Sequence, residues 1–201
     1  MHDLTIYLCR HGDTEWSAQR RLAGHTDLPL IERGEQNARQ LGQRLCAVSF
    51  ERVLVSPLAR ARRTAELAGL GTAAEVDERL LEMDFGHYDG LSVEEVRRQQ
   101  PGWTYLREGC PGGERPADVG RRADALLADL EGMSGNVALV AHSVILRVVA
   151  ARFLGLDPGA GRMFMLSPGA LSILAYDSVD DARAIAVWND RQHLTGQAGF
   201  A

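Results

Sequence analysis

One stretch near the start organises this sequence: Leu8-Cys9-Arg10-His11-Gly12-Asp13-Thr14-Glu15-Trp16-Ser17. The apolar and β-branched run at residues 4–8 that leads into it predicts a β-strand. A strand that ends in Arg-His-Gly places a guanidinium and an imidazole at the carboxyl edge of a sheet, where open α/β sheets bind ligands. A guanidinium fits phosphate oxygens, and a neutral imidazole is a nucleophile near neutral pH. The stretch therefore predicts that Arg10 holds a phosphoryl group and His11 attacks it. Such a tripeptide also arises by chance, so other motifs in the chain are needed to show whether it is catalytic.

The composition is that of an ordinary soluble protein. The chain has 201 residues, of which 45% are hydrophobic and 24% charged, enough for one α/β domain over residues 1–201. A formal net charge of −5 argues against a nucleic-acid surface, which is normally basic. An anion-binding pocket in this chain must therefore be built from a few local cations.

The cysteines and the apolar stretches bear on location. Cys9, Cys46 and Cys110 are odd in number and lack metal-ligand spacing, which favours a reduced, cytoplasmic setting. We see no signal-peptide pattern at the start and no apolar stretch near the ~20 residues of a membrane span. We therefore expect a small-molecule substrate and no nucleic-acid or membrane partner. The oligomeric state is left open, a homodimer included.

Apolar periodicity predicts strands and helices that alternate along most of the chain. The order predicts an α/β fold, specifically a three-layer α/β/α sandwich with a mostly parallel sheet. We expect a helix that starts at Ser56-Pro57, an excursion over the site at about 84–116 and a loose tail from about 190 to 201. The other expected strands are 52–55, 74–76, 136–141, 171–176 and 184–188, and the other expected helices are 32–48, 92–100, 117–133 and 144–154.

Further polar residues fall where they would join His11 at the same edge. His142 ends the clearest strand, Arg60 lies in the first turns after another strand, and Glu82 lies in a loop that could reach both. Two imidazoles and two guanidinium groups around one point describe a site for a dianionic phosphoryl group. Since no metal-ligand spacing is present, we expect an enzyme without a metal or other cofactor.

These residues amount to a resemblance to the histidine phosphatase superfamily, which has the phosphoglycerate mutase-like fold. Five ordered blocks carry it: Arg10-His11-Gly12-x-Thr14-Glu15-Trp16; Gly24-His25-Thr26-Asp27-Leu28-Pro29-Leu30; Ser56-Pro57-Leu58-x-Arg60-Ala61-x-x-Thr64-Ala65; Glu82-x-x-x-Gly86-x-x-x-Gly90; and His142. The resemblance implies that His11 forms a phosphohistidine, that Glu82 is the proton donor, and that His142 completes the catalytic set. It implies that Arg10, Arg60 and His142 bind the phosphate, and we expect Ser17, Gly24 and Ser143 to join them.

The sequence most resembles the phosphatase branch that contains sedoheptulose-1,7-bisphosphatase and related acid phosphatases. Two features indicate this branch: Thr14-Glu15-Trp16-Ser17, where many relatives have asparagine at the last position, and the segment 108–114. Three positions depart from common patterns: Ala23 replaces serine or threonine, Ile31 replaces a helix-capping threonine, and Ser143 replaces glycine. The first and third bear on phosphate affinity and substrate choice.

The sequence thus predicts a metal-independent phosphatase that hydrolyses small phosphorylated metabolites, such as sugar phosphates or bisphosphates. A phosphoglycerate mutase is the alternative enzyme, although no long basic insertion is present to enclose a bisphosphate. A phosphate-binding interaction domain without catalysis is a third interpretation. Whether certain apolar residues form a substrate wall or simply core also stays open: Phe85, Tyr88, Trp103, Met163 and Met165.

Overall fold

The computed structural model describes residues 3–194 and contains one six-stranded sheet in the order β3-β2-β4-β1-β5-β6. The strands are β1 (Leu4–Arg10), β2 (Arg52–Val55), β3 (Ala74–Val76), β4 (Gly135–Ala141), β5 (Leu171–Tyr176) and β6 (Arg183–Asp190). β1, β2, β3 and β4 are parallel, and β5 and β6 continue the sheet in antiparallel pairing. The mostly parallel α/β sandwich that the sequence predicted is confirmed.

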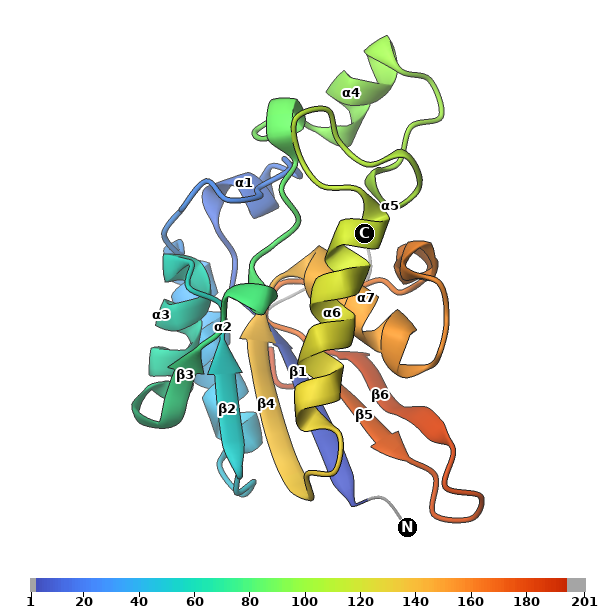
Figure 1. The fold of residues 1–201 in the computed structure, drawn as a ribbon. Helices are drawn as coiled ribbons and strands as arrows, with labels where there is room; N and C mark the ends of the chain where they lie inside the picture. The colour runs from blue at the N-terminus through green and yellow to red at the C-terminus, as the bar shows by residue number, and fades with distance from the viewer. Residues whose placement is uncertain (1–2, 195–201) are drawn as a thin grey trace.

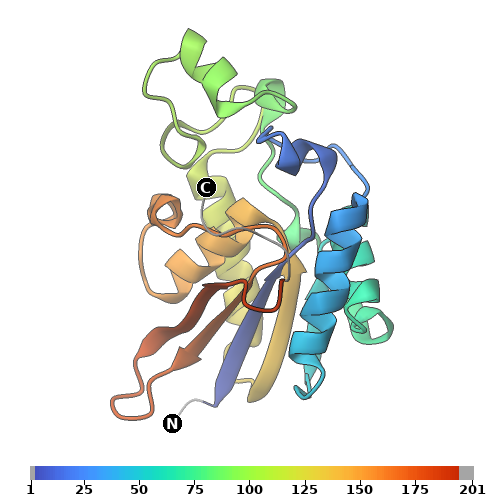
Figure 2. The ribbon, with the colours of Figure 1, turned by 180° about the vertical axis from the view of Figure 1, so that it is seen from behind.

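Helices cover both faces of this sheet (Figures 1 and 2). The α-helices are α1 (Glu15–Ala18), α2 (Glu32–Leu45), α3 (Ala59–Leu67), α4 (Val93–Gln99), α5 (Tyr105–Glu108), α6 (Pro116–Leu130) and α7 (Ser143–Phe153). The 3-10 helices are η1 (Gly71–Ala73), η2 (Glu78–Leu80), η3 (Gly86–Tyr88) and η4 (Pro158–Met163). α2 and α3 lie on one face, and α6 and α7 lie on the other.

Alternation along the central strands builds the two cores. In β1, Ile6 and Leu8 belong to the core that contains α6 and α7, whereas Cys9 belongs to the core that contains α2 and α3. Successive side chains of a strand point to opposite faces, so a strand buried on both sides is apolar throughout. This double burial fixes the register of β1, and with it the place where Arg10 and His11 leave the sheet.

The turn after β1 requires glycine because two backbones meet there. A Cβ atom on Gly12 would collide with the carbonyl oxygen of Gly34, and one on Gly34 would collide with the carbonyl of Asp13. The first turn of α2 therefore packs directly against the Arg-His-Gly turn. Ile31 is the N-cap of α2 and provides no side-chain hydrogen bond to it.

Two expected boundaries are wrong. α3 starts at Ala59 after an uncapped Leu58, and the Ser56 hydroxyl accepts from the Leu58 N–H over 3.4 Å and contacts His142 without capping the helix. The expected loose tail is also corrected at its start. β6 runs through Asp190, and Asn189 and Leu194 are buried. The remainder of that tail, residues 195–201, lies outside the described residues.

The predicted excursion lies beyond the carboxyl edge of the sheet, with α4 at its outer end and α5 closer to α6 (Figure 1). α4 opens with a capping box of Ser92 and Glu95. Trp103 is buried in the core, and its indole N–H donates to the Gly109 carbonyl over 2.9 Å. Across residues 3–194, none of the helices combines the length and the apolar character that a membrane crossing needs.

Candidate active site

A cavity of about 230 Å³ opens at the carboxyl edge of the sheet, beneath the excursion. Its wall combines arginine, histidine and glutamate side chains with a larger apolar set. The lining residues are Arg10, His11, Thr14, Ser17, Arg20, Arg21, Leu22, Ala23, Glu82, Phe85, Val93, Tyr105, Ser143 and Val144. The structure thus brings Arg10, His11 and Glu82 to one cavity from distant parts of the chain.

His11 is held in the tautomer that leaves one ring nitrogen free to attack. Its Nδ1 lies 2.7 Å from the carbonyl oxygen of Gly12, and because a carbonyl only accepts, Nδ1 carries the proton. Burial, reinforced by repulsion from the guanidinium groups of Arg60 and Arg10, holds the pKa of His11 well below its usual range. The Nε2 atom therefore keeps its lone pair at neutral pH.

Arg10 lies beside His11 with an unused donor. One Nη1–H donates to the carbonyl of Leu166, while Nε is buried and has no partner among the described residues. Burial lowers the pKa of Arg10 to about 10, so its guanidinium remains charged at neutral pH. A buried donor without a partner is costly, and an anion in the cavity would satisfy it.

His142 stands directly behind His11, with the two ring centroids 5.1 Å apart. The Nε–H of Arg60 donates to its Nδ1 over 3.1 Å, so the ring proton is on Nε2, which lies 2.7 Å from the Ser56 hydroxyl. Burial, with repulsion from Arg60 and His11, holds the pKa of His142 well below its usual range. His142 is thus a neutral ring whose two nitrogens are both occupied by the protein.

Arg60 is fully buried and ties this layer to the loop of residues 23–26. Its guanidinium donates to the carbonyls of Thr26 and Gly24, over 2.8 and 2.7 Å, and over 3.2 Å to that of Ala23. Arg60, His142 and Gly24 are absent from the cavity wall as it stands. The four-residue convergence predicted from the sequence is present, with Arg60 and His142 in a layer behind His11.

Gly24 has a packing role that its sequence position did not reveal. Its N–H donates to Asp89 over 2.6 Å, so that donor is taken. A Cβ there would lie 2.8 Å from the carbonyl of Met83, which is too close for any other residue. The expectation that Gly24 helps to bind phosphate is therefore corrected to close packing against the segment that follows Glu82.

Glu82 reaches the cavity from the other side. Its carboxylate accepts hydrogen bonds from the backbone N–H groups of Met83, Val144 and Ile145, at 2.9, 3.1 and 3.1 Å. Val144 and Ile145 belong to the first turn of α7, where free N–H groups and the helix dipole favour an anion. The carboxyl group of Glu82 therefore lies at the N-terminus of α7, on the same cavity as His11.

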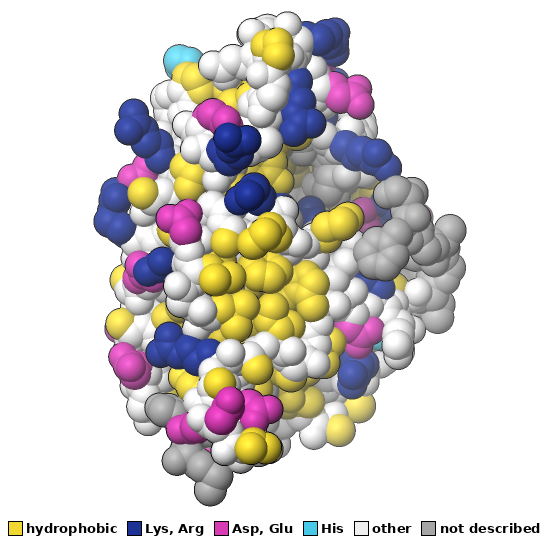
Figure 3. All heavy atoms as spheres, turned by 90° about the vertical axis from the view of Figure 1, so that its right-hand side faces the viewer, with side chains coloured by type: hydrophobic (Ala, Val, Ile, Leu, Met, Phe, Trp, Pro, Cys, Tyr) yellow, Lys and Arg dark blue, Asp and Glu magenta, His cyan; other side chains and the backbone are white. Residues whose placement is uncertain are grey.

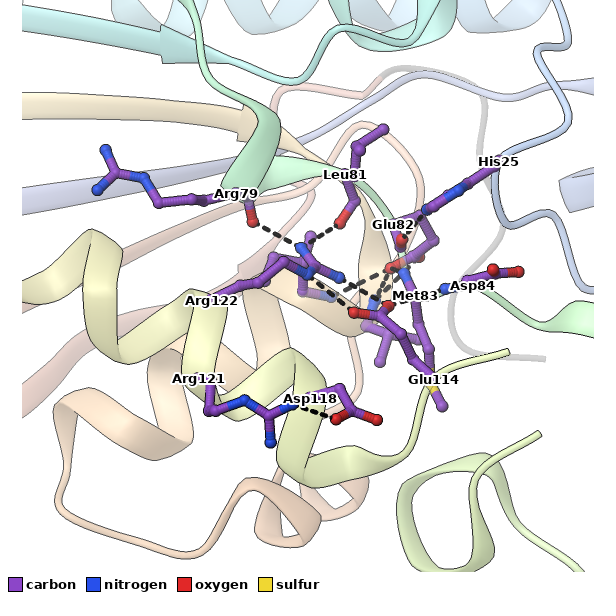
Figure 4. A network of polar contacts seen from close by, with 12 residues as sticks. His25, Arg79, Leu81, Glu82, Met83, Asp84, Glu114, Asp118, Arg121 and Arg122 are labelled. Carbon is purple, nitrogen blue, oxygen red and sulfur yellow. Dashed lines mark hydrogen bonds and ion pairs between the residues drawn. The ribbon is translucent and has the colours of Figure 1, made fainter. Parts of the chain in front are cut away.

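A half-buried ion pair holds the segment that carries Glu82 (Figure 4). Arg122 of α6 makes two hydrogen bonds of 2.9 Å to the carboxylate of Glu114 and also donates to the carbonyls of Arg79 and Leu81. The same carboxylate accepts from the N–H of Asp84 over 2.9 Å. Arg122 and Glu114 thus fix the backbone on both sides of Glu82. On the opposite side of the segment, His25 lies 3.0 Å from the Glu82 carbonyl.

The two predicted serines both line the cavity, but their hydroxyl groups differ in their hydrogen bonds. The Ser17 hydroxyl accepts from the N–H of Thr14 over 2.9 Å and donates to its carbonyl over 3.0 Å, which caps α1. Ser143 begins α7, and its hydroxyl has no partner among residues 3–194. Ser143 is therefore the readier hydrogen-bond donor, and the phosphate-binding roles of both stay predictions.

Several lining residues were missed because nothing in the sequence ties them to the site. Tyr105 projects from the excursion, and Arg147 donates to its hydroxyl over 2.9 Å. Arg20 and Arg21 follow α1, and only their closeness to the Arg-His-Gly stretch could have pointed to them. Val93 comes from α4, whose position depends on the whole excursion.

The apolar residues left open from the sequence divide between wall, core and surface. Phe85 is buried and also lines the cavity, whereas Trp103 is core alone. Met163 and Met165 are 62% and 63% exposed and lie outside the cavity. Neither interpretation holds for these two methionines. Figure 3 shows a broad apolar area on the face to which η4 and β6 belong.

Metal-binding side chains do not gather in the part of the chain that the structure describes: no three of His, Cys, Asp or Glu come together there as a candidate metal site. Metal independence remains a prediction about the reaction, to be tested in solution.

Comparison with known proteins agrees with the fold and the cavity. Residues 6–191 match the family model of the histidine phosphatase superfamily, branch 1. An acid phosphatase of Mycobacterium tuberculosis is 36% identical over 176 residues, which cover 86% of each chain. A probable phosphoglycerate mutase of Salmonella choleraesuis is 34% identical over 183 residues, which cover 86% of this chain and 85% of the relative.

Solved structures give the same result. The structure of an open reading frame product of M. tuberculosis superimposes with a TM-score of 0.88 at 35% identity, over 94% of this chain and 98% of that one. A mycobacterial glucosyl-3-phosphoglycerate phosphatase solved with VO3 gives a TM-score of 0.82 at 27% identity, over 93% and 99%.

The fold, the cavity and these relatives define a phosphoric monoester hydrolase. The chain belongs to the histidine phosphatase superfamily, as the resemblance of its five motif blocks predicted.

Proposed function

We propose that this protein hydrolyses small phosphomonoesters, without a metal, through a phosphohistidine on Nε2 of His11. The observation that carries the proposal is a free imidazole lone pair next to a charged guanidinium whose buried Nε–H has no partner within residues 3–194. Phosphoryl transfer needs a positioned nucleophile and charge stabilisation more than it needs covalent machinery from the protein. His11 and Arg10 provide these two elements in one cavity.

In the first step, the Nε2 lone pair of His11 bonds to phosphorus and the bond to the ester oxygen breaks. Glu82 gives a proton to that oxygen, so the leaving group departs as an alcohol. Three backbone N–H donors hold the Glu82 carboxyl group in place for this transfer. In the second step, water attacks the phosphohistidine, Glu82 accepts a proton from the water, and inorganic phosphate leaves, so that His11 and Glu82 both return to their starting states.

The cavity favours small metabolites as substrates. Its volume of about 230 Å³ is below the range of drug-sized sites, and its lining includes apolar side chains from residues 22, 85, 93, 105 and 144. A compact phosphorylated metabolite fits this space, whereas a protein substrate would need a more open surface. Cytoplasmic location is part of the proposal, since such metabolites are found there.

A second candidate is phosphoglycerate mutase activity, which the relative named as a probable phosphoglycerate mutase supports. The relatives named acid phosphatase and glucosyl-3-phosphoglycerate phosphatase support hydrolysis. The two activities differ in the fate of the phosphoryl group. Incubation with 3-phosphoglycerate separates them: inorganic phosphate indicates the phosphatase, and 2-phosphoglycerate indicates the mutase.

Hydrolysis of p-nitrophenyl phosphate in EDTA tests the proposal. We expect turnover that EDTA leaves unchanged and that vanadate, an analogue of the transferring phosphoryl group, inhibits competitively. Turnover that EDTA abolishes and added metal restores would remove the metal-free mechanism. Phosphate binding without any turnover would instead indicate the non-catalytic interaction domain.

A further inference from the structure

The mouth of the catalytic cavity carries an arginine that the proposed reaction does not use. Arg20 lines the cavity of about 230 Å³ and also a more open depression of about 680 Å³ beside it. The two hollows share Arg20, Arg21 and Val93, so the catalytic cavity continues outward between the end of α1 and α4. A substrate with its phosphoryl group at His11 would extend its other end along this path.

Arg20 and Arg98 are the cations of this path without a hydrogen bond or ion pair within residues 3–194, and of the two only Arg20 also lines the catalytic cavity. Arg21 donates to the carbonyl of Gly90 over 2.6 Å and pairs with Glu95 over 3.3 Å. No hydrogen bond or ion pair engages the guanidinium of Arg20 in the described part of the chain. The Arg20 donors are therefore available to a ligand, whereas the Arg21 guanidinium is held through Nη1 by Gly90 and Glu95.

The backbone at Arg20 is in a conformation that other residues adopt at lower cost. The residue follows α1 with a φ of 57°, in the left-handed region where glycine or asparagine is usual after a helix. The chain nevertheless has arginine there, which directs a long cationic side chain to the mouth of the cavity. Non-glycine residues in this region are concentrated at functional sites.

The local charge is opposite to that of the whole protein. Three arginines and two glutamates line the outer depression, while the chain carries a formal net charge of −5. One of the glutamates, Glu95, is paired with Arg21. A second anion on the substrate would therefore meet a positive region at the end of the path.

We propose that Arg20 binds a second negative charge, a carboxylate or a second phosphate, on the part of the substrate that leaves with the ester oxygen. This rests on the proposed function, because it assigns the phosphoryl group to His11 and the remainder of the substrate to the outer path. A guanidinium matches both anions through paired N–H donors. The substrates would then be phosphomonoesters with two anionic ends separated by a short, partly apolar body.

The variant Arg20→Asn tests this with little risk to the fold, because asparagine adopts left-handed φ values more readily than arginine does. The substrate pair is 3-phosphoglycerate and glycerol 3-phosphate, which differ by a carboxylate in place of a hydroxymethyl group. We expect kcat/KM for 3-phosphoglycerate to fall about 10-fold, mostly through KM, and that for glycerol 3-phosphate to change less than about two-fold. Arg62→Asn, which removes an exposed arginine of α3 outside both hollows, should change neither.

A second pair, fructose 1,6-bisphosphate and fructose 6-phosphate, identifies which anion is bound. An Arg20-dependent preference in the first pair alone indicates a carboxylate, and one in the second pair alone indicates a phosphate. The proposal would be overturned if Arg20→Asn changed kcat/KM by the same factor for the two substrates of each pair. It would also be overturned if kcat/KM changed for none of the substrates. Dissociation constants measured calorimetrically in a His11→Ala chain, with and without Arg20→Asn, keep the test independent of turnover. Absence of hydrolysis would count against the proposed function, while the ratio of dissociation constants still decides the role of Arg20.

Discussion

The two sides of the catalytic cavity are held in different ways. The floor, Arg10 and His11, emerges from a strand buried on both faces, so the sheet fixes its position. The roof, residues 79–116, contains only short helices and depends on side-chain contacts, above all the pair of Arg122 and Glu114. The position of Arg10 and His11 therefore depends on the fold as a whole, whereas the position of Glu82 depends on one ion pair between residues eight apart in the chain.

The largest expected effect concerns the floor. His11→Ala removes the nucleophile, so turnover of every phosphomonoester should be lost while the far-UV circular dichroism and the thermal unfolding midpoint stay close to those of the wild type. Steady-state assays with p-nitrophenyl phosphate and glycerol 3-phosphate measure this. Retention of full activity would refute the assignment of His11.

Glu82→Gln removes the proposed proton donor of the roof while keeping the shape of the side chain. We expect a loss of ~10²–10⁴-fold in kcat/KM for an alkyl phosphate, whose leaving group needs a proton. The loss for p-nitrophenyl phosphate should be smaller, because p-nitrophenolate leaves without one. A comparison of the two esters reads out proton transfer directly, and equal losses would demote Glu82 from the proton donor to a structural residue.

Arg122→Met tests whether the roof depends on its ion pair. Without the guanidinium, Glu114 and the carbonyls of Arg79 and Leu81 lose their partner, and the segment that carries Glu82 is expected to shift. We expect about a 10-fold loss for alkyl phosphates and a smaller one for p-nitrophenyl phosphate, the same ester dependence as for Glu82→Gln but weaker.

Arg121→Met is the matched control for this variant. Arg121 is the neighbouring residue on α6, and its side chain is 73% exposed and paired only with Asp118 among the described residues. This variant should leave both esters unaffected. A loss in Arg122→Met that is uniform across leaving groups would show that the ion pair supports the fold and not the position of Glu82.

The smallest expected effect is on the pH dependence of the free energy of unfolding. It should respond to a change in the floor and not to a change in the roof. The folded chain holds the pKa values of His11 and His142 well below 6.5, while the unfolded chain binds protons near 6.5. The free energy of unfolding should therefore fall as pH drops below about 6.5, by up to about 1.4 kcal/mol per pH unit for each histidine. Urea unfolding between pH 5 and 7.5, a range set by these values, measures the slope. His11→Asn should reduce that slope, whereas Arg122→Met should not.

The same contrast explains how far the sequence could predict the site. His11 and His142 directly follow strands, and parallel strands present their carboxyl ends at one edge, so their meeting follows from local patterns. Glu82 required the motif resemblance, since no periodicity positions a loop. Arg122 reads as one polar residue of an amphipathic helix, and its role depends on a contact with Glu114 that only the folded excursion creates.

Errors at the level of single elements have the same origin. Ser56 and Pro57 have the sequence of a helix start, yet the hydroxyl of Ser56 is taken by His142, which lies 86 residues away in the chain. Gly24 belongs to a recognised motif, but the reason for glycine there is the Met83 carbonyl packed against it. In both cases the role of the residue depends on a contact with a residue distant in the chain, which the neighbouring sequence does not reveal.

The proposed mechanism depends most on Nε2 of His11 as the phosphoryl acceptor. The direct measurement is to mix the protein with a ³²P-labelled phosphomonoester, quench in alkali on the millisecond scale and locate the label by peptide mapping. We predict label on Nε2 of His11, formed and lost at rates that account for turnover and absent in His11→Ala. Hydrolysis that proceeds without a labelled protein, or with label on another residue, would contradict the account.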